Sequence, residues 1–172
     1  MIFIDTKQII LNATIKLMKV DKPNKLTVQN ILDEAHVSRS TFYSFFSDKY
    51  DVINYYFKSY ADSISNENVE NSCAYQFLYD NKDYFIKALA VEGQNSFEDF
   101  FYNYYYDDCS RMYLKNMNKE SLSDDDRISL EFYCRGSLHI AKQWLTRGAK
   151  ESPLKMRQLT HQLIPEKYWK LL

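Results

Sequence analysis

A chain of 172 residues with only 3 Gly and 3 Pro has few sharp turns, which argues against an all-β fold and favours an all-α one. The net charge is −1, but residues 1–60 carry 8 Lys and Arg against 6 Asp and Glu, while the remainder carries 14 against 17. A polyanionic partner is therefore expected at the N-terminal end. No apolar run approaches the roughly 18 residues of a membrane span. Three widely spaced Cys without a CxxC pair favour a reducing, cytoplasmic setting.

The first helix is predicted over residues 5–18, where apolar side chains recur at i, i+3 and i+7. A short second helix is expected after the N-cap Thr27, and a short third helix after the N-cap Ser38. A tight corner at His36 and Val37 separates these two helices. Such a corner between two short helices predicts a helix-turn-helix unit.

Longer helices are predicted for the rest of the chain. One begins at Ser47 or Asp48, and the others cover about 69–79, 82–91, 96–114, 123–147 and 153–163. About nine helices are therefore expected in total.

The segment VSRSTFYSFFSDK has the composition of a DNA-reading helix. Val37, Phe42 and Phe46 are expected to face the bracing helices. The side chains left to project outward are Arg39, Ser40, Thr41, Tyr43 and Ser44. Hydroxyl groups and an Arg on such a face suit phosphates and base edges in a major groove.

The stretch TVQNILDEAHVSRSTFYSFFSDKYDVI resembles the DNA-binding domain of TetR/AcrR-type transcriptional regulators in residue type and spacing over more than twenty residues. Further on, WLTRGAKESPLKM resembles the stretch that joins the last two helices in the branch related to dihydroxyacetone-kinase regulators. Two positions depart from the family pattern: the corner Gly is His36 and a His is Phe45. The family's Gly implies a positive φ at this corner, which is uncommon outside Gly, although His is among the better-tolerated exceptions.

The resemblance implies a three-helix DNA-binding domain at residues 1–50 and a larger helical effector-binding and dimerisation domain at 51–172. It implies phosphate contacts by Thr27, Ser38, Thr41, Tyr43 and Lys49. It implies base contacts by Arg39, Ser40 and Ser44.

The predicted helix at 123–147 has two apolar rows, so it needs a cover on two sides. Gly136 in its interior costs about 1 kcal/mol relative to Ala, which suggests the close approach of another helix. Together with the last helix, this suits a two-fold homodimer interface, although a monomer core would show the same rows. The expected interface residues are Phe132, Gly136, Ile140, Trp144, Met156, Leu159 and Leu163.

The segment FEDFFYNYYYDD supplies aromatic residues to either an effector pocket or an aromatic core. The pocket residues would be Phe97, Phe101, Tyr104 and Asp108. Asp107 lies four residues before Arg111, a spacing that predicts a surface ion pair.

The three His and three Cys show no metal-ligand spacing, and no catalytic motif is present, so neither a metal, a cofactor nor an enzyme is expected. The sequence therefore predicts a regulator, most simply a repressor, that binds a palindromic operator as a homodimer and responds to a small molecule of unknown identity. The alternative is a coactivator or adaptor that keeps this fold and acts through protein–protein contacts without operator binding.

Overall fold

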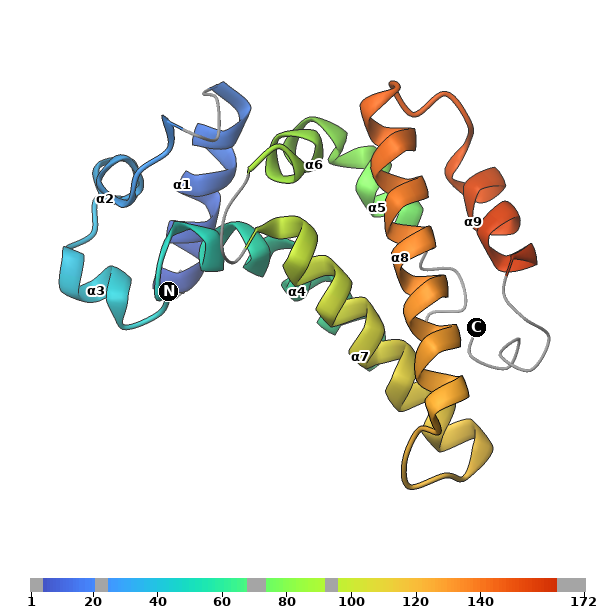
Figure 1. Cartoon of the computed structure of the whole chain (residues 1–172). Helices are drawn as coiled ribbons and strands as arrows, with labels where there is room; N and C mark the ends of the chain where they lie inside the picture. The colour runs from blue at the N-terminus through green and yellow to red at the C-terminus, as the bar shows by residue number, and fades with distance from the viewer. Residues whose placement is uncertain (1–4, 21–24, 68–73, 92–95, 164–172) are drawn as a thin grey trace. The chain divides into compact units, whose positions relative to one another are not determined.

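The computed structural model describes residues 5–20, 25–67, 74–91 and 96–163, and this part of the chain is all-helical (Figure 1). Its helices are α1 (Thr6–Val20), α2 (Val28–Ala35), α3 (Arg39–Tyr43), α4 (Lys49–Glu67), α5 (Ala74–Asp80), α6 (Lys82–Leu89), α7 (Phe97–Met117), α8 (Asp124–Thr146) and α9 (Pro153–Gln162). The predicted all-α class and the number of helices are confirmed over these residues. The start of the helix predicted at 69–79 lies outside the described residues, and α5 is described from Ala74.

The chain divides into two compact units. One comprises residues 1–72 and 81–97, with α1 to α4 and α6; the other comprises residues 73–80 and 98–172, with α5, α8, α9 and α7 from Glu98. The predicted division into domains 1–50 and 51–172 concerns function, and it stays a prediction.

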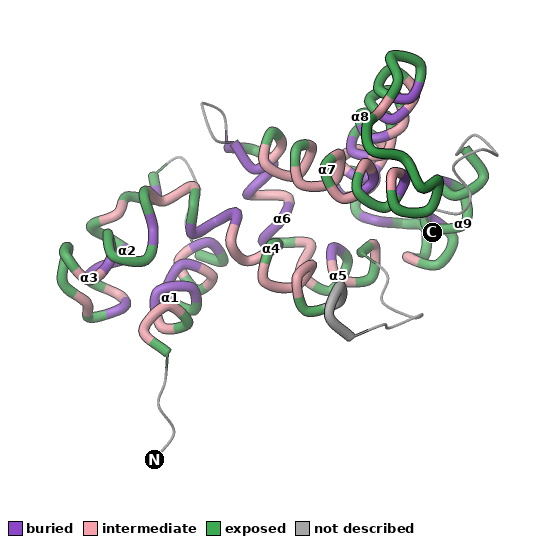
Figure 2. Tube along the Cα trace, turned by 90° about the horizontal axis from the view of Figure 1, so that it is seen from below, coloured by how far each residue is buried: buried purple, intermediate pink, exposed green. Residues whose placement is uncertain are grey.

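The first unit is built around apolar faces of α1, α2, α4 and α6, whose buried residues are shown in purple in Figure 2. Phe85 of α6 is fully buried and lies between aromatic rings of Phe57 and Phe97, with centroids 6.2 and 5.3 Å away. Tyr84 donates a hydrogen bond to the Ile53 carbonyl of α4 at 3.1 Å. These contacts tie α6 to α4.

In the second unit, α7 packs on α8 through a small core. Cys109, Tyr113, Leu130 and Cys134 are buried together there, with several half-buried Tyr rings around them. The Tyr105 and Tyr133 hydroxyls also meet at 3.1 Å between the two helices.

A buried carboxylate fixes the turn from α7 to α8. Asp126, in the first turn of α8, accepts hydrogen bonds from Tyr113 at 2.8 Å, Lys119 at 2.9 Å and Ser123 at 2.7 Å. Its side chain is 5% exposed. The ammonium of Lys119 and the Ser123 and Tyr113 hydroxyls hold the pKa of Asp126 well below its usual range, although burial opposes this.

None of the helices in the described ranges is both long and apolar enough to cross a membrane.

Candidate nucleic-acid interface

The helix-turn-helix begins with a complete capping box. Thr27 adopts an extended backbone, and its hydroxyl accepts from the backbone N–H of Asn30 at 3.1 Å. In return, Asn30 Oδ1 accepts from the backbone N–H of Thr27 at 3.0 Å. The predicted N-cap is confirmed. Two N–H groups at the start of α2 are thereby satisfied within the protein.

The corner between α2 and α3 is made by a non-glycine residue in the left-handed region. His36 has φ 53° and ψ 42°, and its N–H donates to the Leu32 carbonyl. The positive φ expected at this position is confirmed. His36 is exposed, so its ring is not held by a core contact.

Hydroxyl groups at the start of α3 bond to one another. Ser38 caps the helix by accepting from the Thr41 N–H at 3.1 Å, and its oxygen lies 2.9 Å from Ser40 Oγ and 2.8 Å from Thr41 Oγ1. The Ser44 hydroxyl donates to the Thr41 carbonyl at 2.7 Å. These four side chains therefore hydrogen-bond within the protein in the absence of DNA, and a hydroxyl can bond to DNA only in addition to these bonds or in place of them.

The Phe side chains of this segment are buried, whereas its Arg and Tyr side chains are exposed. Phe42 and Phe46 are 0% and 2% exposed, with ring centroids 6.0 Å apart. Arg39 is exposed, and Tyr43 is 48% exposed. One difference from the prediction is that α3 ends at Tyr43, so Phe46 lies in the turn after the helix.

Lys49, at the start of α4, makes a contact that its sequence position does not predict. Its ammonium donates to the Leu26 carbonyl at 2.8 Å and lies 5.1 Å from the centre of the Tyr50 ring. Lys49 therefore ties α4 to the residue before the α2 cap. Its other two N–H donors remain available to a phosphate.

Two residues near this surface were not predicted. Gln29 of α2 accepts a hydrogen bond from Arg39 at 3.3 Å, and the Lys7 ammonium of α1 lies 3.9 Å from the centre of the Tyr55 ring. Each contact joins two different helices, so the spacing of residues within one helix could not predict it.

The predicted dimer residues divide between the surface and the interior of the second unit. Phe132, Gly136, Leu159 and Leu163 are exposed, and Ile140 is half-buried. Trp144 and Met156 are instead buried within the protomer. Trp144 stacks on Tyr79 and donates its indole N–H to the Glu151 carbonyl at 3.0 Å. These two side chains therefore pack inside the protomer, and their place in a dimer interface stays a prediction.

The predicted pocket residues are not all equivalent. Phe97 belongs to the aromatic core of the first unit, while Phe101, Tyr104 and Asp108 lie half-buried on α7 in the second. Burial raises the pKa of Asp108, and the nearby Arg111 guanidinium opposes that rise. Arg111 pairs with Asp108 at 2.9 Å, so the predicted pairing with the Asp107 carboxylate was wrong. Arg111 meets Asp107 only at its carbonyl, at 3.4 Å.

Among the residues that the structure describes, no three His, Cys, Asp or Glu side chains gather in a way that would hold a metal ion.

Two short capped helices, a left-handed corner and an exposed Arg–Tyr face define a helix-turn-helix protein. A family model described as "Bacterial regulatory proteins, tetR family" matches residues 10–56, and one described as "Transcriptional regulator C-terminal region" matches residues 73–166. The chain therefore belongs to the TetR family of transcriptional regulators. This is a family of regulators and not of enzymes.

Solved structures share the fold at low sequence identity. The "Dihydroxyacetone kinase operon activator DhaS" is 18% identical with a TM-score of 0.59, covering 92% of this chain and 96% of its own. A TetR transcriptional regulator from Streptococcus agalactiae is 19% identical with a TM-score of 0.59, covering 94% of both chains. The fatty acid degradation regulator FadR from Bacillus halodurans is 16% identical with a TM-score of 0.52, covering 92% and 94%. A sequence comparison with curated proteins finds no match.

Proposed function

We propose that this chain binds a palindromic operator as a homodimer and regulates transcription, most simply by repression, in response to a small molecule. One observation carries the DNA-binding part. On the single turn of α3, Phe42 is buried while Arg39 and Tyr43 project into solvent. A short helix with one face in the core and a polar face outside is the arrangement that enters a major groove.

The hydrogen-bonding groups of this face support the same proposal. Ser38, Ser40 and Thr41 place short hydroxyl side chains at the start of α3, where they bond to one another, so the backbone there can come close to a phosphate. Arg39 keeps donors that can form a bidentate contact with guanine, which is the commonest specific contact in the major groove.

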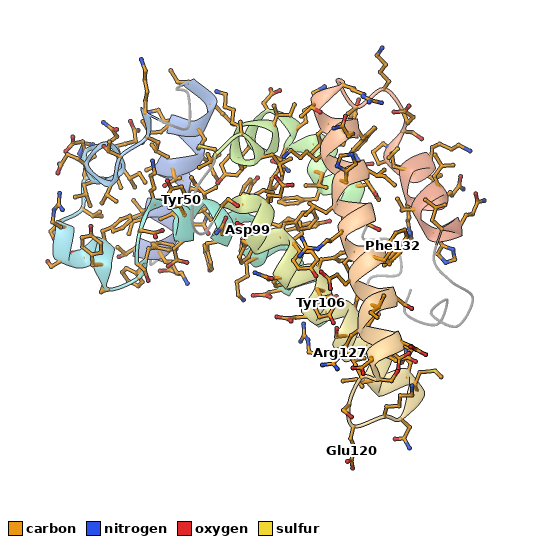
Figure 3. All side chains as sticks on the ribbon, in the orientation of Figure 1. Tyr50, Asp99, Tyr106, Glu120, Arg127 and Phe132 are labelled. Carbon is orange, nitrogen blue, oxygen red and sulfur yellow. The ribbon has the colours of Figure 1, made fainter. Side chains whose placement is uncertain are left out.

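Homodimerisation is supported by the surface of α8. Phe132, labelled in Figure 3, is 83% exposed, and Ile128 is 68% exposed. A Cβ added to Gly136 would meet no atom of a neighbouring helix within 4 Å, so none of the helices that the structure describes explains this glycine. Leu159 of α9 and Leu163, the C-cap of that helix, add exposed apolar side chains. A second copy would cover this surface and present two α3 helices to two half-sites.

Of the four residues expected to line an effector pocket, Phe97 is part of the core of the first unit. The proposed pocket residues are therefore Phe101, Tyr104 and Asp108 on α7. Aromatic walls with one carboxylate suit an organic molecule with a donor group. Such a ligand would act by changing the operator affinity of the dimer.

A second candidate function rests on Phe45, which is 40% exposed beside α3. An apolar ring on this face suits an adaptor that binds another protein in place of an operator.

DNA binding separates the two candidates. Duplexes are selected from a randomised library with the full-length protein, and binding is then measured at two salt concentrations, together with DNA flanking the coding region. A palindromic consensus whose affinity falls with salt is expected for the regulator. Absence of sequence-selective binding even at low salt would favour the adaptor.

A further inference from the structure

Three exposed polar side chains form a chain of hydrogen bonds across the corner. Gln29 Nε2 of α2 donates to Asp33 Oδ1 at 2.8 Å, and Arg39 Nη2 of α3 donates to Gln29 Oε1 at 3.3 Å. Gln29 and Asp33 are four residues apart, which places them on the same face of α2. The carboxylate of Asp33 is therefore linked to the guanidinium of Arg39 through one amide.

The orientation of that amide follows from its neighbours. An ionised carboxylate only accepts hydrogen bonds, and a guanidinium only donates them. The Gln29 NH₂ group must therefore face Asp33, and its oxygen must face Arg39. The reversed amide would place a donor against a donor and an acceptor against an acceptor.

Core contacts and caps fix the two helices, α2 and α3, that carry these three hydrogen-bonded side chains. Leu32 of α2 and Phe42 of α3 are 5% and 0% exposed, and both helices begin with a side-chain cap. The side-chain oxygen of Gln29 is therefore presented to Arg39 from a helix whose position is fixed by the core. Arg39 is the first residue of α3, and among the described residues its side chain makes no other hydrogen bond or ion pair.

We propose that Gln29 is a positioning residue that directs Arg39 toward DNA, with Asp33 fixing the Gln29 amide. The proposal rests on the proposed function, in which Arg39 reads a base. Only one N–H of Nη2 is used by Gln29, so four guanidinium donors remain for guanine. Holding the side chain in advance reduces the conformational entropy that Arg39 loses on binding.

The test uses the full-length protein and the duplex selected from the randomised library, with a scrambled duplex as the non-specific probe. Gln29→Met removes both hydrogen bonds and keeps the length and helix propensity of the side chain. We expect an affinity for the selected duplex about two- to tenfold lower, the range set by freeing one long side chain. Affinity for the scrambled duplex should not change, and the loss in discrimination should fall on the base pair read by Arg39.

A matched control lies in the second unit. Gln76 donates to Asp80 at 2.8 Å with the same i, i+4 spacing, on α5. Gln76→Met removes an equivalent surface pair and should leave DNA binding unchanged. Thermal unfolding of both variants shows whether either has lost structure.

A double-mutant cycle decides how Gln29 acts. If Gln29 works through Arg39, the effect of Gln29→Met disappears in an Arg39→Ala background. An undiminished effect in that background would mean that Gln29 contacts DNA itself, and it would overturn the proposal, as would wild-type affinity of Gln29→Met. If the wild-type protein selected no sequence, the proposed function would fail first, and the positioning role with it.

Discussion

Phe42 and Tyr43 are consecutive residues, but the side chain of Phe42 points into the core and that of Tyr43 points into solvent. Their ring centroids are 5.3 Å apart in an edge-to-face arrangement, yet Phe42 is fully buried and Tyr43 is 48% exposed. Successive residues of a helix point about 100° apart, so a single turn can hold one ring in the core and offer the next to a partner. The Tyr43 ring is held by Phe42, and its hydroxyl remains in solvent.

Tyr43→Phe tests that hydroxyl. Because the ring contact with Phe42 is kept, we expect the free energy of unfolding to change by no more than about 0.5 kcal/mol. If the hydroxyl binds a phosphate, affinity should fall by a similar factor for selected and scrambled duplexes. Tyr79→Phe, a partly exposed Tyr of α5, serves as the control in the same fluorescence-anisotropy titration. DNA binding equal to wild type would exclude this role for Tyr43.

His36→Gly tests the corner between α2 and α3. The left-handed conformation costs a residue with a Cβ roughly 1–2 kcal/mol, and glycine avoids that cost. Glycine also loses more entropy on folding, so we expect a net gain of about 0.5–1 kcal/mol in thermal or urea unfolding. Unchanged DNA affinity in this variant would show that the imidazole is not a DNA contact. A loss of affinity in a more stable protein would assign one to it.

Asp126→Asn tests the carboxylate at the α7–α8 turn. The pKa of Asp126 is lower in the folded protein, so its stabilising effect is complete above the unfolded value of about 3.9 and is lost as pH falls below it. At neutral pH the substitution should cost about 1–3 kcal/mol, and the difference from wild type should shrink in urea unfolding at pH 3. Asp125→Asn is the control, because it removes the same charge from the same helical turn at an exposed position. An equal cost at both pH values would show that the charge of Asp126 is unimportant.

Gly136 tests the dimer. Since a Cβ at this position would meet no atom of another described helix within 4 Å and the position is exposed, both Gly136→Ala and Gly136→Trp should fold. Alanine should add about 1 kcal/mol of helix stability, whereas tryptophan should prevent close approach of a second copy. Light scattering should then give a dimer mass for wild type and a monomer mass for Gly136→Trp. A dimer of unchanged stability with tryptophan would contradict the proposed use of this glycine.

Local features of the fold were predictable because each depends on residues close together in sequence. The N-caps Thr27 and Ser38 each accept from an N–H three residues later, and both were expected. The end of α3 was missed because the i, i+4 spacing of Phe42 and Phe46 also fits a helix followed by a turn.

The sequence could not predict which part of the protein, or which partner, covers each apolar row of α8. Residues four apart in a helix are offset by about 40°, so the row from Ile128 to Trp144 turns through about 160° along α8. Its start is exposed, and its end is buried against α5 and the loop before α9. Periodicity identifies such a row, but whether it meets its own core or a partner depends on contacts distant in sequence. The same reason explains Phe97, whose neighbours Phe57 and Phe85 come from other helices.

The most direct measurement of the central claim compares Arg39→Ala with Lys49→Ala on the selected and scrambled duplexes over a range of salt concentrations. Arg39→Ala should lower discrimination by about 1–3 kcal/mol. Lys49→Ala should weaken both duplexes alike and reduce the salt slope by about 1, with thermal unfolding reporting the separate loss of its bond to Leu26. Equal, sequence-independent losses for the two variants would contradict the account of α3 as a DNA-reading helix.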